Sequence, residues 1–119
     1  MFVRKIEDTE NVDWMDGVKK RLMIGPKDGA PTYLMRVYEI APGTIYPLHT
    51  HNYEHEGTPL SGEGILVGKN SEKKIKPGVV YFVPPNEPHS VINKGKDVLR
   101  LLCTAPLCAY NAMADPANK

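Results

Sequence analysis

The feature that most restricts the fold of this chain is the spacing of its turn-forming residues. Eleven prolines and 10 glycines divide the 119 residues into short runs of β-forming side chains. Turn signals that recur about every 8–12 residues are typical of an all-β sandwich or barrel. We expect one short helical turn around Trp14, at residues 12–18, and otherwise no helix. The expected strands cover residues 19–24, 33–40, 49–55, 64–69, 73–75, 79–83, 89–93 and 98–104.

The length is sufficient for a single domain. We expect a barrel at residues 18–108, preceded by an N-terminal arm at residues 1–17 that either caps the barrel or lies across a partner subunit. The remaining residues, 109–119, are small and polar and are expected to form a frayed or surface-packed C-terminal tail.

Charge and cysteine content exclude several classes of partner. The formal net charge is +1 with both signs interspersed, so neither nucleic acid nor an anionic membrane is an expected partner. No apolar run approaches the ~20 residues that span a bilayer, and the N-terminus lacks the apolar core of a signal peptide. Cys103 and Cys108 do not form a CxxC pair, which argues against a thiolate zinc site. We therefore expect a cytoplasmic protein with reduced thiols.

All four histidines lie in two short segments. His49, His51 and His55 fall within residues 43–56, and His89 within residues 78–93. Neutral imidazole is the commonest side-chain ligand of divalent transition metals. Residues two apart on a strand share a face, about 7 Å apart along the chain, so the first three rings can face one ion while His89 joins them from a neighbouring strand. The histidines therefore predict a metal site that leaves two positions of a six-coordinate ion open to ligands.

A carboxylate competes with His55 for the third position. Glu56 also suits divalent metals and would reduce the charge of the site by one. Strand alternation places Glu56 on the face opposite His51 and His55, which favours histidine. A bulge or turn between residues 52 and 56 would reverse this argument.

The two histidine segments resemble the paired motifs of the cupin family. Its first motif, with a glycine, HxH, a glutamate and a second glycine, is matched at residues 43–62. Its second motif is matched by Gly78, Pro84, His89 and Asn93, with Asn86 where the family prefers glycine. Asparagine tolerates a positive φ, so the turn is expected to survive. The resemblance implies a double-stranded β-helix, the cupin or jelly-roll barrel, with a metal in its mouth.

The sequence HxHxxEHE at residues 49–56 is further similar to a subgroup of small, single-domain bacterial cupins. That resemblance implies a four-histidine manganese site in which His55 and not Glu56 is the third ligand, and it implies a homodimer. Fe²⁺, Zn²⁺ or Ni²⁺ are the alternative ions. The chain departs from the family after the first motif, where Gly57 and Pro59 predict a bulge, an edge or a loop in place of a regular strand.

Three further residues are candidates for a substrate pocket. Arg36 lies in a mostly apolar run and is either an anion clamp near the metal or an outer-face arginine; the resemblance places it in the cavity. Cys103 is either a small buried side chain or a pocket thiol. Tyr46 either lines the mouth of the site or packs beside it.

Four neutral ligands leave the full double charge on the metal, so we expect a small, anionic, oxygen-bearing substrate. The first hypothesis is a dioxygenase-type oxidation by manganese or iron. The second is a lyase, isomerase or decarboxylase that uses the metal as a Lewis acid. The third is a small-molecule or metal-binding module without turnover.

Overall fold

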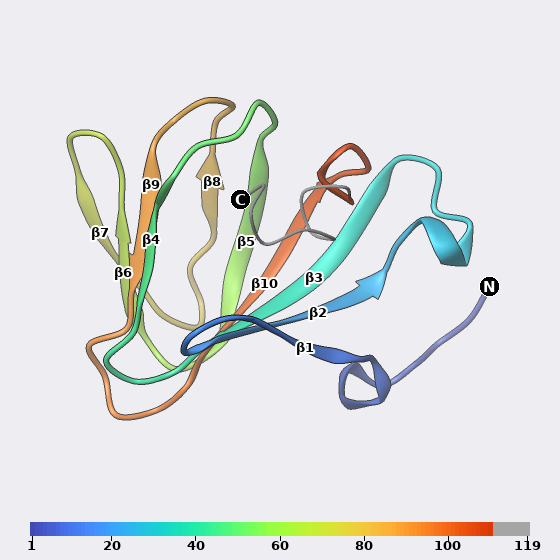
Figure 1. The fold of residues 1–119 in the computed structure, drawn as a ribbon, viewed down its shortest axis with the longest axis horizontal. Helices are drawn as coiled ribbons and strands as arrows, with labels where there is room; N and C mark the ends of the chain where they lie inside the picture. The colour runs from blue at the N-terminus through green and yellow to red at the C-terminus, as the bar shows by residue number, and fades with distance from the viewer. Residues whose placement is uncertain (111–119) are drawn as a thin grey trace.

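The computed structural model describes residues 1–110, and the expected tail lies outside this range except for Ala109 and Tyr110. Within it the chain forms strands and two short 3₁₀ turns, Ile6–Asp8 and Pro26–Asp28 (Figure 1). The strands are β1 Asn11–Met15, β2 Val18–Ile24, β3 Tyr33–Ile40, β4 Ile45–His49, β5 His55–Ser61, β6 Gly64–Val67, β7 Glu72–Ile75, β8 Tyr81–Val83, β9 His89–Ile92 and β10 Leu99–Pro106.

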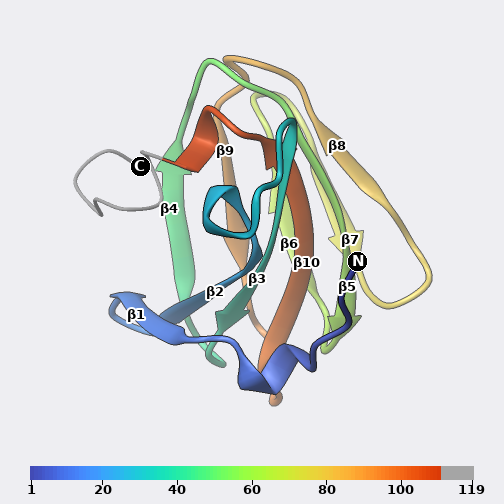
Figure 2. The same cartoon turned by 90° about the vertical axis from the view of Figure 1, so that its right-hand side faces the viewer.

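These strands build two antiparallel sheets that face each other across one core (Figures 1 and 2). The larger sheet has the order β1-β2-β3-β10-β5-β8, and the smaller has the order β4-β9-β6-β7. The expected all-β jelly-roll fold is therefore confirmed. The main buried cluster joins both sheets and consists of Trp14, Val18, Ile40, Tyr46, Ile75, Val91, Leu99 and Leu101.

Strand β10 shows most directly why the sequence folds in this way. Its buried residues alternate with half-buried ones, so Leu99, Leu101, Cys103 and Ala105 point inward. This period of two is that of a strand with one face in the core. Because β10 pairs with β3 on one side and β5 on the other, its register fixes which side chains of both neighbours face the core.

The helical turn expected at residues 12–18 is wrong, because this segment is a β-hairpin. Strand β1 pairs with β2, and Met15 lies opposite Val18. The two-residue loop between them is Asp16-Gly17, with Gly17 at φ +78°. An Asp-Gly pair between short strands is a strong hairpin signal, and it outweighs the weak helical pattern. The hairpin places Trp14 in the core.

Residues before β1 lie against the outer face of the larger sheet. The Arg21 guanidinium donates to the Thr9 carbonyl at 2.6 Å, and Arg100 forms an ion pair with Glu7 at 3.2 Å. Arg4 pairs with Asp28 at 2.9 Å. These contacts hold the start of the chain on its own barrel.

The single strand expected at residues 49–55 is also wrong. Strand β4 ends at His49, the chain bends, and β5 begins at His55 in the other sheet. Strand β5 continues to Ser61, so Gly57 and Pro59 lie in a strand and not in a loop. Of the bulge, edge or loop expected there, the register shows a bulge: Leu101 pairs with Pro59 and Arg100 with Ser61, which leaves Leu60 as an extra residue. Strand β8 pairs only with residues 55–57, so the proline lies beyond it.

No helix in residues 1–110 is both long and apolar enough to cross a membrane.

Candidate metal centre

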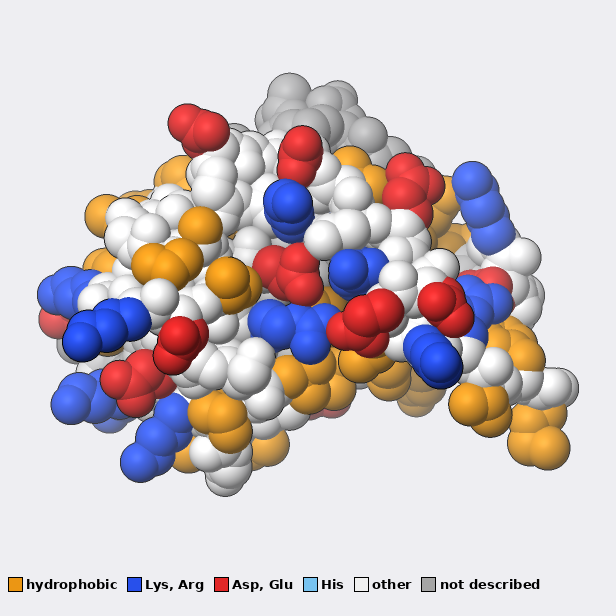
Figure 3. Space-filling model, turned by 90° about the horizontal axis from the view of Figure 1, so that it is seen from below, with side chains coloured by type: hydrophobic (Ala, Val, Ile, Leu, Met, Phe, Trp, Pro, Cys, Tyr) orange, Lys and Arg blue, Asp and Glu red, His pale blue; other side chains and the backbone are white. Residues whose placement is uncertain are grey.

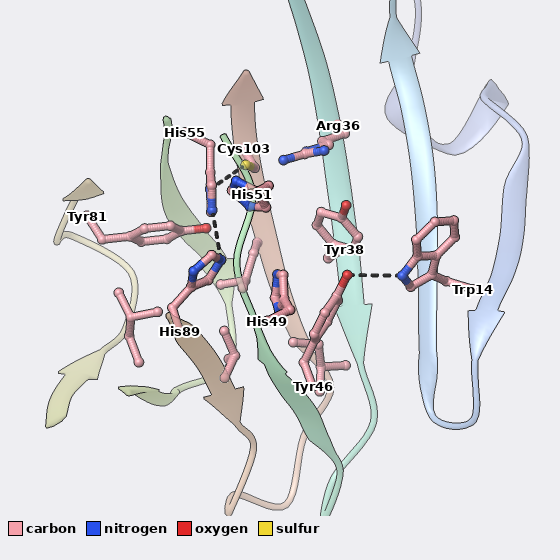
Figure 4. Close-up of a pocket in the computed structure, with 14 residues that line it drawn as sticks. Trp14, Arg36, Tyr38, Tyr46, His49, His51, His55, Tyr81, His89 and Cys103 are labelled. Atoms are coloured by element: carbon pink, nitrogen blue, oxygen red, sulfur yellow. Dashed lines mark hydrogen bonds between the residues drawn. The ribbon is translucent and has the colours of Figure 1, made fainter. Parts of the chain in front are cut away.

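A cavity of about 50 Å³ lies between the two sheets, and all four histidines line it (Figure 4). The volume is enough for a few water molecules or a ligand of a few heavy atoms. From below, acidic and basic side chains are interspersed and no histidine of the described residues is visible (Figure 3). The remaining lining residues are Trp14, Arg36, Tyr38, Ile40, Tyr46, Leu66, Tyr81, Val91, Leu101 and Cys103.

Three histidines form a compact group. His49, at the end of β4, is paired in register with His89, at the start of β9. His51 lies in the bend that follows β4, and its ring stacks on Tyr53 with centroids 4.1 Å apart. The ring nitrogens that these three histidines offer all lie within 4.8 Å of one another. Two strands of the smaller sheet and one bend therefore bring the two sequence segments together.

Main-chain carbonyl oxygens determine which nitrogen of each of these rings carries the hydrogen. The Nδ1 atoms of His49, His51 and His89 lie 2.8, 2.9 and 2.8 Å from the carbonyl oxygens of Pro47, Tyr53 and Glu87. A carbonyl oxygen only accepts, so Nδ1 must carry the hydrogen and donate it. The Nε2 lone pair of each neutral ring is then free to bind a metal, which is the usual arrangement of metal-ligating histidine.

A contact between the two motifs holds the bend of His51 in place. The Asn86 main-chain N–H donates to the His51 carbonyl at 2.7 Å. Asn86 has φ +67° and is the one non-glycine residue with positive φ in residues 1–110. The expected tolerance of asparagine for this conformation is thus confirmed, and the turn that it forms fixes the His51 loop beside His89.

Burial keeps the four rings neutral. Desolvation is the main reason that the pKa of each histidine is lowered, to about 4 for His49 and about 2 for His55. The positive charge of Arg36 lowers the pKa of all four further. Neutral imidazole is the form that binds metals, so near neutral pH protons compete little with an ion at this site.

His55 stands apart from the group of three. Its Nε2 lies 3.3 Å from Nε2 of His89, and its Nδ1 lies 3.2 Å from the Cys103 sulfur. His55 begins β5 in the larger sheet, and the buried Cys103 thiol contacts the Nδ1 side of its ring (Figure 4). The expected cluster of four is therefore seen as three close histidines with a fourth beside one of them.

Two proton arrangements fit the His55 contacts. If the Cys103 thiol donates to Nδ1, then Nε2 of His55 carries a hydrogen and can donate to His89. If Nδ1 donates to the sulfur, both Nε2 lone pairs face each other at 3.3 Å. Two metal–nitrogen bonds of about 2.1 Å at a right angle would separate their nitrogens by roughly 3 Å. The second arrangement thus suits a shared cation.

The carboxylates of the first motif point away from the cavity. Glu54 and Glu56 are both exposed, whereas His55 between them is 9% exposed. Glu56 shares a register position with Phe82, which is itself exposed on the outer face of β8. The burial of His55 favours it over Glu56, although the bend after His49 removes the unbroken strand on which the expected alternation depended.

Arg36, Tyr46 and Cys103, the expected pocket residues, all line the cavity. Arg36 is 3% exposed, and its Nε atom has no hydrogen-bond partner in residues 1–110. Within residues 1–110, the lining contains no aspartate or glutamate. A buried guanidinium without a carboxylate favours an anionic ligand in the same cavity.

Sequence reasoning missed three aromatic lining residues. Trp14, around which a helical turn was expected, faces the cavity, and its Nε1 donates to the Tyr46 hydroxyl at 3.0 Å. Tyr38 packs edge-on against Tyr46 with centroids 5.7 Å apart. Tyr81 reaches in from β8. Inward parity on the strands at residues 33–40 and 79–83 was the available signal for the two tyrosines.

The sequence of this chain is similar to a known protein family and to another protein. A family model described as "Cupin domain" matches residues 36–105. An uncharacterized protein of Methanocaldococcus jannaschii is 33% identical over 51 residues, which are 43% of this chain and 38% of that protein. The chain thus spans little more than a third of this curated relative.

Solved structures share the fold. The polyketide cyclase RemF from Streptomyces resistomycificus superposes with a TM-score of 0.81 at 26% identity, over 90% of this chain and 80% of that chain. A predicted oxalate decarboxylase from Thermotoga maritima superposes with a TM-score of 0.76 at 24% identity, over 89% and 99% of the two chains.

Proposed function

This chain belongs to the cupin family, and on that premise we propose that it is a metal-dependent enzyme acting on a small, anionic, oxygen-bearing organic molecule. One observation carries the proposal. Three buried or half-buried imidazoles, whose Nδ1 hydrogens are donated to main-chain carbonyls, direct their free Nε2 lone pairs into one cavity. Within residues 1–110, His55 is the one group at hydrogen-bond distance from any of these Nε2 atoms. A cation satisfies such a set of acceptors.

The proposed ligand set is His49, His51, His55 and His89, with manganese as the preferred ion. His55 joins the set when its Nδ1 hydrogen is donated to Cys103, as the 3.2 Å contact allows. The choice of manganese over Fe²⁺, Zn²⁺ or Ni²⁺ rests on the resemblance of residues 49–56 to the four-histidine subgroup. Elemental analysis of protein purified without added metal tests it.

The chemistry proposed is non-oxidative. The neutral histidines would leave the double charge on a bound divalent ion, which would then supply Lewis-acid polarisation of a substrate oxygen. No anionic side chain in the proposed ligand set would offset the higher charge of an oxidised ion, which favours a reaction without electron transfer. The relatives named as a cyclase and a predicted decarboxylase fit this class of reaction.

The chain's own residues bind and orient the substrate. The Arg36 guanidinium attracts its negative charge within the cavity, and the aromatic wall of Trp14, Tyr38 and Tyr46 excludes water. The described residues place no carboxylate in the lining, so among them a proton exchanged with the substrate passes through a histidine, a tyrosine or Cys103.

Metal replacement separates the three hypotheses. The protein is loaded with Zn²⁺ or Mn²⁺ and incubated with small carboxylic acids in the presence and absence of oxygen. Conversion with Zn²⁺ without oxygen is the result expected here. Conversion that requires both oxygen and Mn²⁺ or Fe²⁺ supports the dioxygenase-type alternative, and tight binding without conversion supports a non-catalytic module.

On the resemblance alone, we also propose a homodimer. A cytoplasmic location is proposed from the sequence, and the two free thiols, Cys103 and Cys108, suit a reducing compartment. Light scattering on the purified protein measures the mass of the assembly directly.

A further inference from the structure

One transverse row of the larger sheet faces the histidines. In register across four neighbouring strands lie Arg36 on β3, Cys103 on β10, Gly57 on β5 and Tyr81 on β8. Residues directly paired across antiparallel strands share a face of the sheet. All four positions of this row therefore point inward. The large donors Arg36 and Tyr81 lie at its two ends, with the small residues Cys103 and Gly57 between them.

Gly57 allows Tyr81 to lie across the row. A Cβ atom at position 57 would come within 2.7 Å of the Tyr81 hydroxyl oxygen and 2.8 Å of the adjoining ring carbon. Those distances are too short for real contacts, so the tip of the tyrosine occupies the space that a side chain at 57 would need. The hydroxyl group consequently extends from β8 over β5, toward His55 and Cys103 (Figure 4).

The Tyr81 hydroxyl is available to a ligand. It makes no hydrogen bond to another protein group of residues 1–110, although the residue lines the cavity. Burial raises the pKa of Tyr81 well above its usual value, so the phenol remains a hydrogen-bond donor at neutral pH. Arg36 reaches the same cavity from the other side of Cys103, and its guanidinium can only donate.

We propose that Tyr81 and Arg36 together hold the carboxylate of the substrate, and that Gly57 determines whether this two-donor clamp can form. The assignment rests on the proposed metal-dependent function and narrows its substrate class. With the carboxylate on this wall beside His55, and the group of His49, His51 and His89 across the cavity, the substrate is a small acid with a second oxygen on the neighbouring carbon. Such 2-hydroxy or 2-oxo acids have few heavy atoms, as the cavity of about 50 Å³ requires.

The test measures binding of glycolate, the smallest 2-hydroxy acid, to the Co²⁺-loaded protein through the visible absorption of the ion. Tyr81→Phe keeps the ring and removes the hydroxyl. We expect one Co²⁺ per chain in both proteins and at least a tenfold weaker affinity for glycolate in the variant, since a hydrogen bond to a charged group is lost. Tyr33→Phe, which alters an exposed tyrosine of β3, is the matched control and should bind glycolate as the wild type does.

An affinity for glycolate that changes by less than twofold in Tyr81→Phe, with the metal in place, overturns the clamp but leaves the metal site intact. A wild-type protein that takes up no metal overturns the proposed function instead. In that case calorimetry of glycolate binding to the metal-free protein tests the clamp. Weaker glycolate binding in Tyr81→Phe than in the wild type supports the clamp, and absence of binding to the wild type contradicts it.

Gly57→Ala supplies a second, independent variant. Its added methyl displaces the tip of Tyr81, so the folded protein should lose glycolate affinity to the same extent as Tyr81→Phe. The double variant should lose no more than either single variant, because both remove the same hydrogen bond. Additive losses would show that position 57 acts on binding by another route. The methyl would also meet the Leu102 carbonyl oxygen, so circular dichroism must first verify the fold.

Discussion

At the scale of single residues, the candidate metal centre is organised by main-chain carbonyls and not by acidic side chains. Three histidines each donate Nδ1–H to a carbonyl two residues away in sequence. Such local contacts come with the backbone conformation and set the tautomer of each ring before any ion binds. The ligands are therefore pre-oriented without adding a negative charge to the cavity.

Removing one imidazole of the close group should abolish tight metal binding while the barrel persists. His51→Ala and His89→Ala each delete a ligand atom, and the core cluster does not depend on either ring. Glu56→Gln is the matched control, because this exposed side chain points away from the cavity. Metal content by elemental analysis gives the answer, and a large loss of metal in Glu56→Gln would reverse the assignment of His55.

Cys103 provides a test of the fourth ligand. Cys103→Ala removes the group that accepts Nδ1–H of His55 when its Nε2 faces a metal. Loss of such an orienting partner typically weakens metal affinity about 10–100-fold. Cys108→Ala alters the exposed thiol and should have no effect. Equal metal affinity in wild type and Cys103→Ala, measured by competition with a chelator, would show that His55 is not held in this way.

Lys20 makes the stability of the fold depend on pH in the alkaline range. Its ammonium lies 3.3 Å from the Trp14 ring centroid, and burial, followed by the charge of Arg36, lowers its pKa to about 8 from 10.5. Above pH 8 the unfolded chain holds this proton while the folded chain releases it, so the free energy of unfolding rises with pH.

Between pH 8 and about 9.5 the urea midpoint of the wild type should rise relative to that of Lys20→Met, because the variant has no titratable side chain at position 20. Lys19→Met, at the exposed neighbouring position, should follow the wild type. Parallel pH profiles of urea midpoints in wild type and Lys20→Met would contradict the lowered pKa.

At the scale of strands, the sequence predicted elements well where the alternation is regular. Strand β3 has the expected bounds, 33–40, and β10 differs at its ends only. Prediction failed where tertiary contacts determine the backbone. The bend after His49 depends on the N–H of Asn86, 35 positions along the chain from His51, and no local pattern encodes it. The hairpin at Asp16-Gly17 does have a local signal, because an Asp-Gly pair favours a tight hairpin turn over the helical turn expected there.

The hairpin of β1 and β2 closes one side of the cavity through Trp14. Trp14→Phe removes the Nε1 hydrogen bond to the buried Tyr46 hydroxyl, 3.0 Å long, and leaves space behind. The expected loss in free energy of unfolding is roughly 1–3 kcal/mol. Val12→Ala, on the exposed side of β1, should change it by less than about 0.5 kcal/mol. Urea unfolding followed by circular dichroism measures both, and equal stabilities of the two variants would contradict a structural role for the indole.

At the scale of the whole molecule, two sheets contribute different parts of one site. The smaller sheet carries His49 and His89, while the larger sheet supplies His55, Arg36 and Cys103 from its inner face. The histidine pattern and the strand parity are local features of the sequence, so the sequence could predict which of these residues line the cavity. It could not predict the proton on each ring, the gap at position 57 or the place of Tyr81, since these depend on cross-strand register.

Anomalous diffraction from a crystal of the zinc-loaded protein locates the ion among the histidines. We expect a single strong peak about 2.0–2.1 Å from Nε2 of His49, His51 and His89, with Nε2 of His55 as the fourth nitrogen. A peak elsewhere on the chain, or rings that stay apart with no peak between them at millimolar zinc, would contradict the proposed metal site.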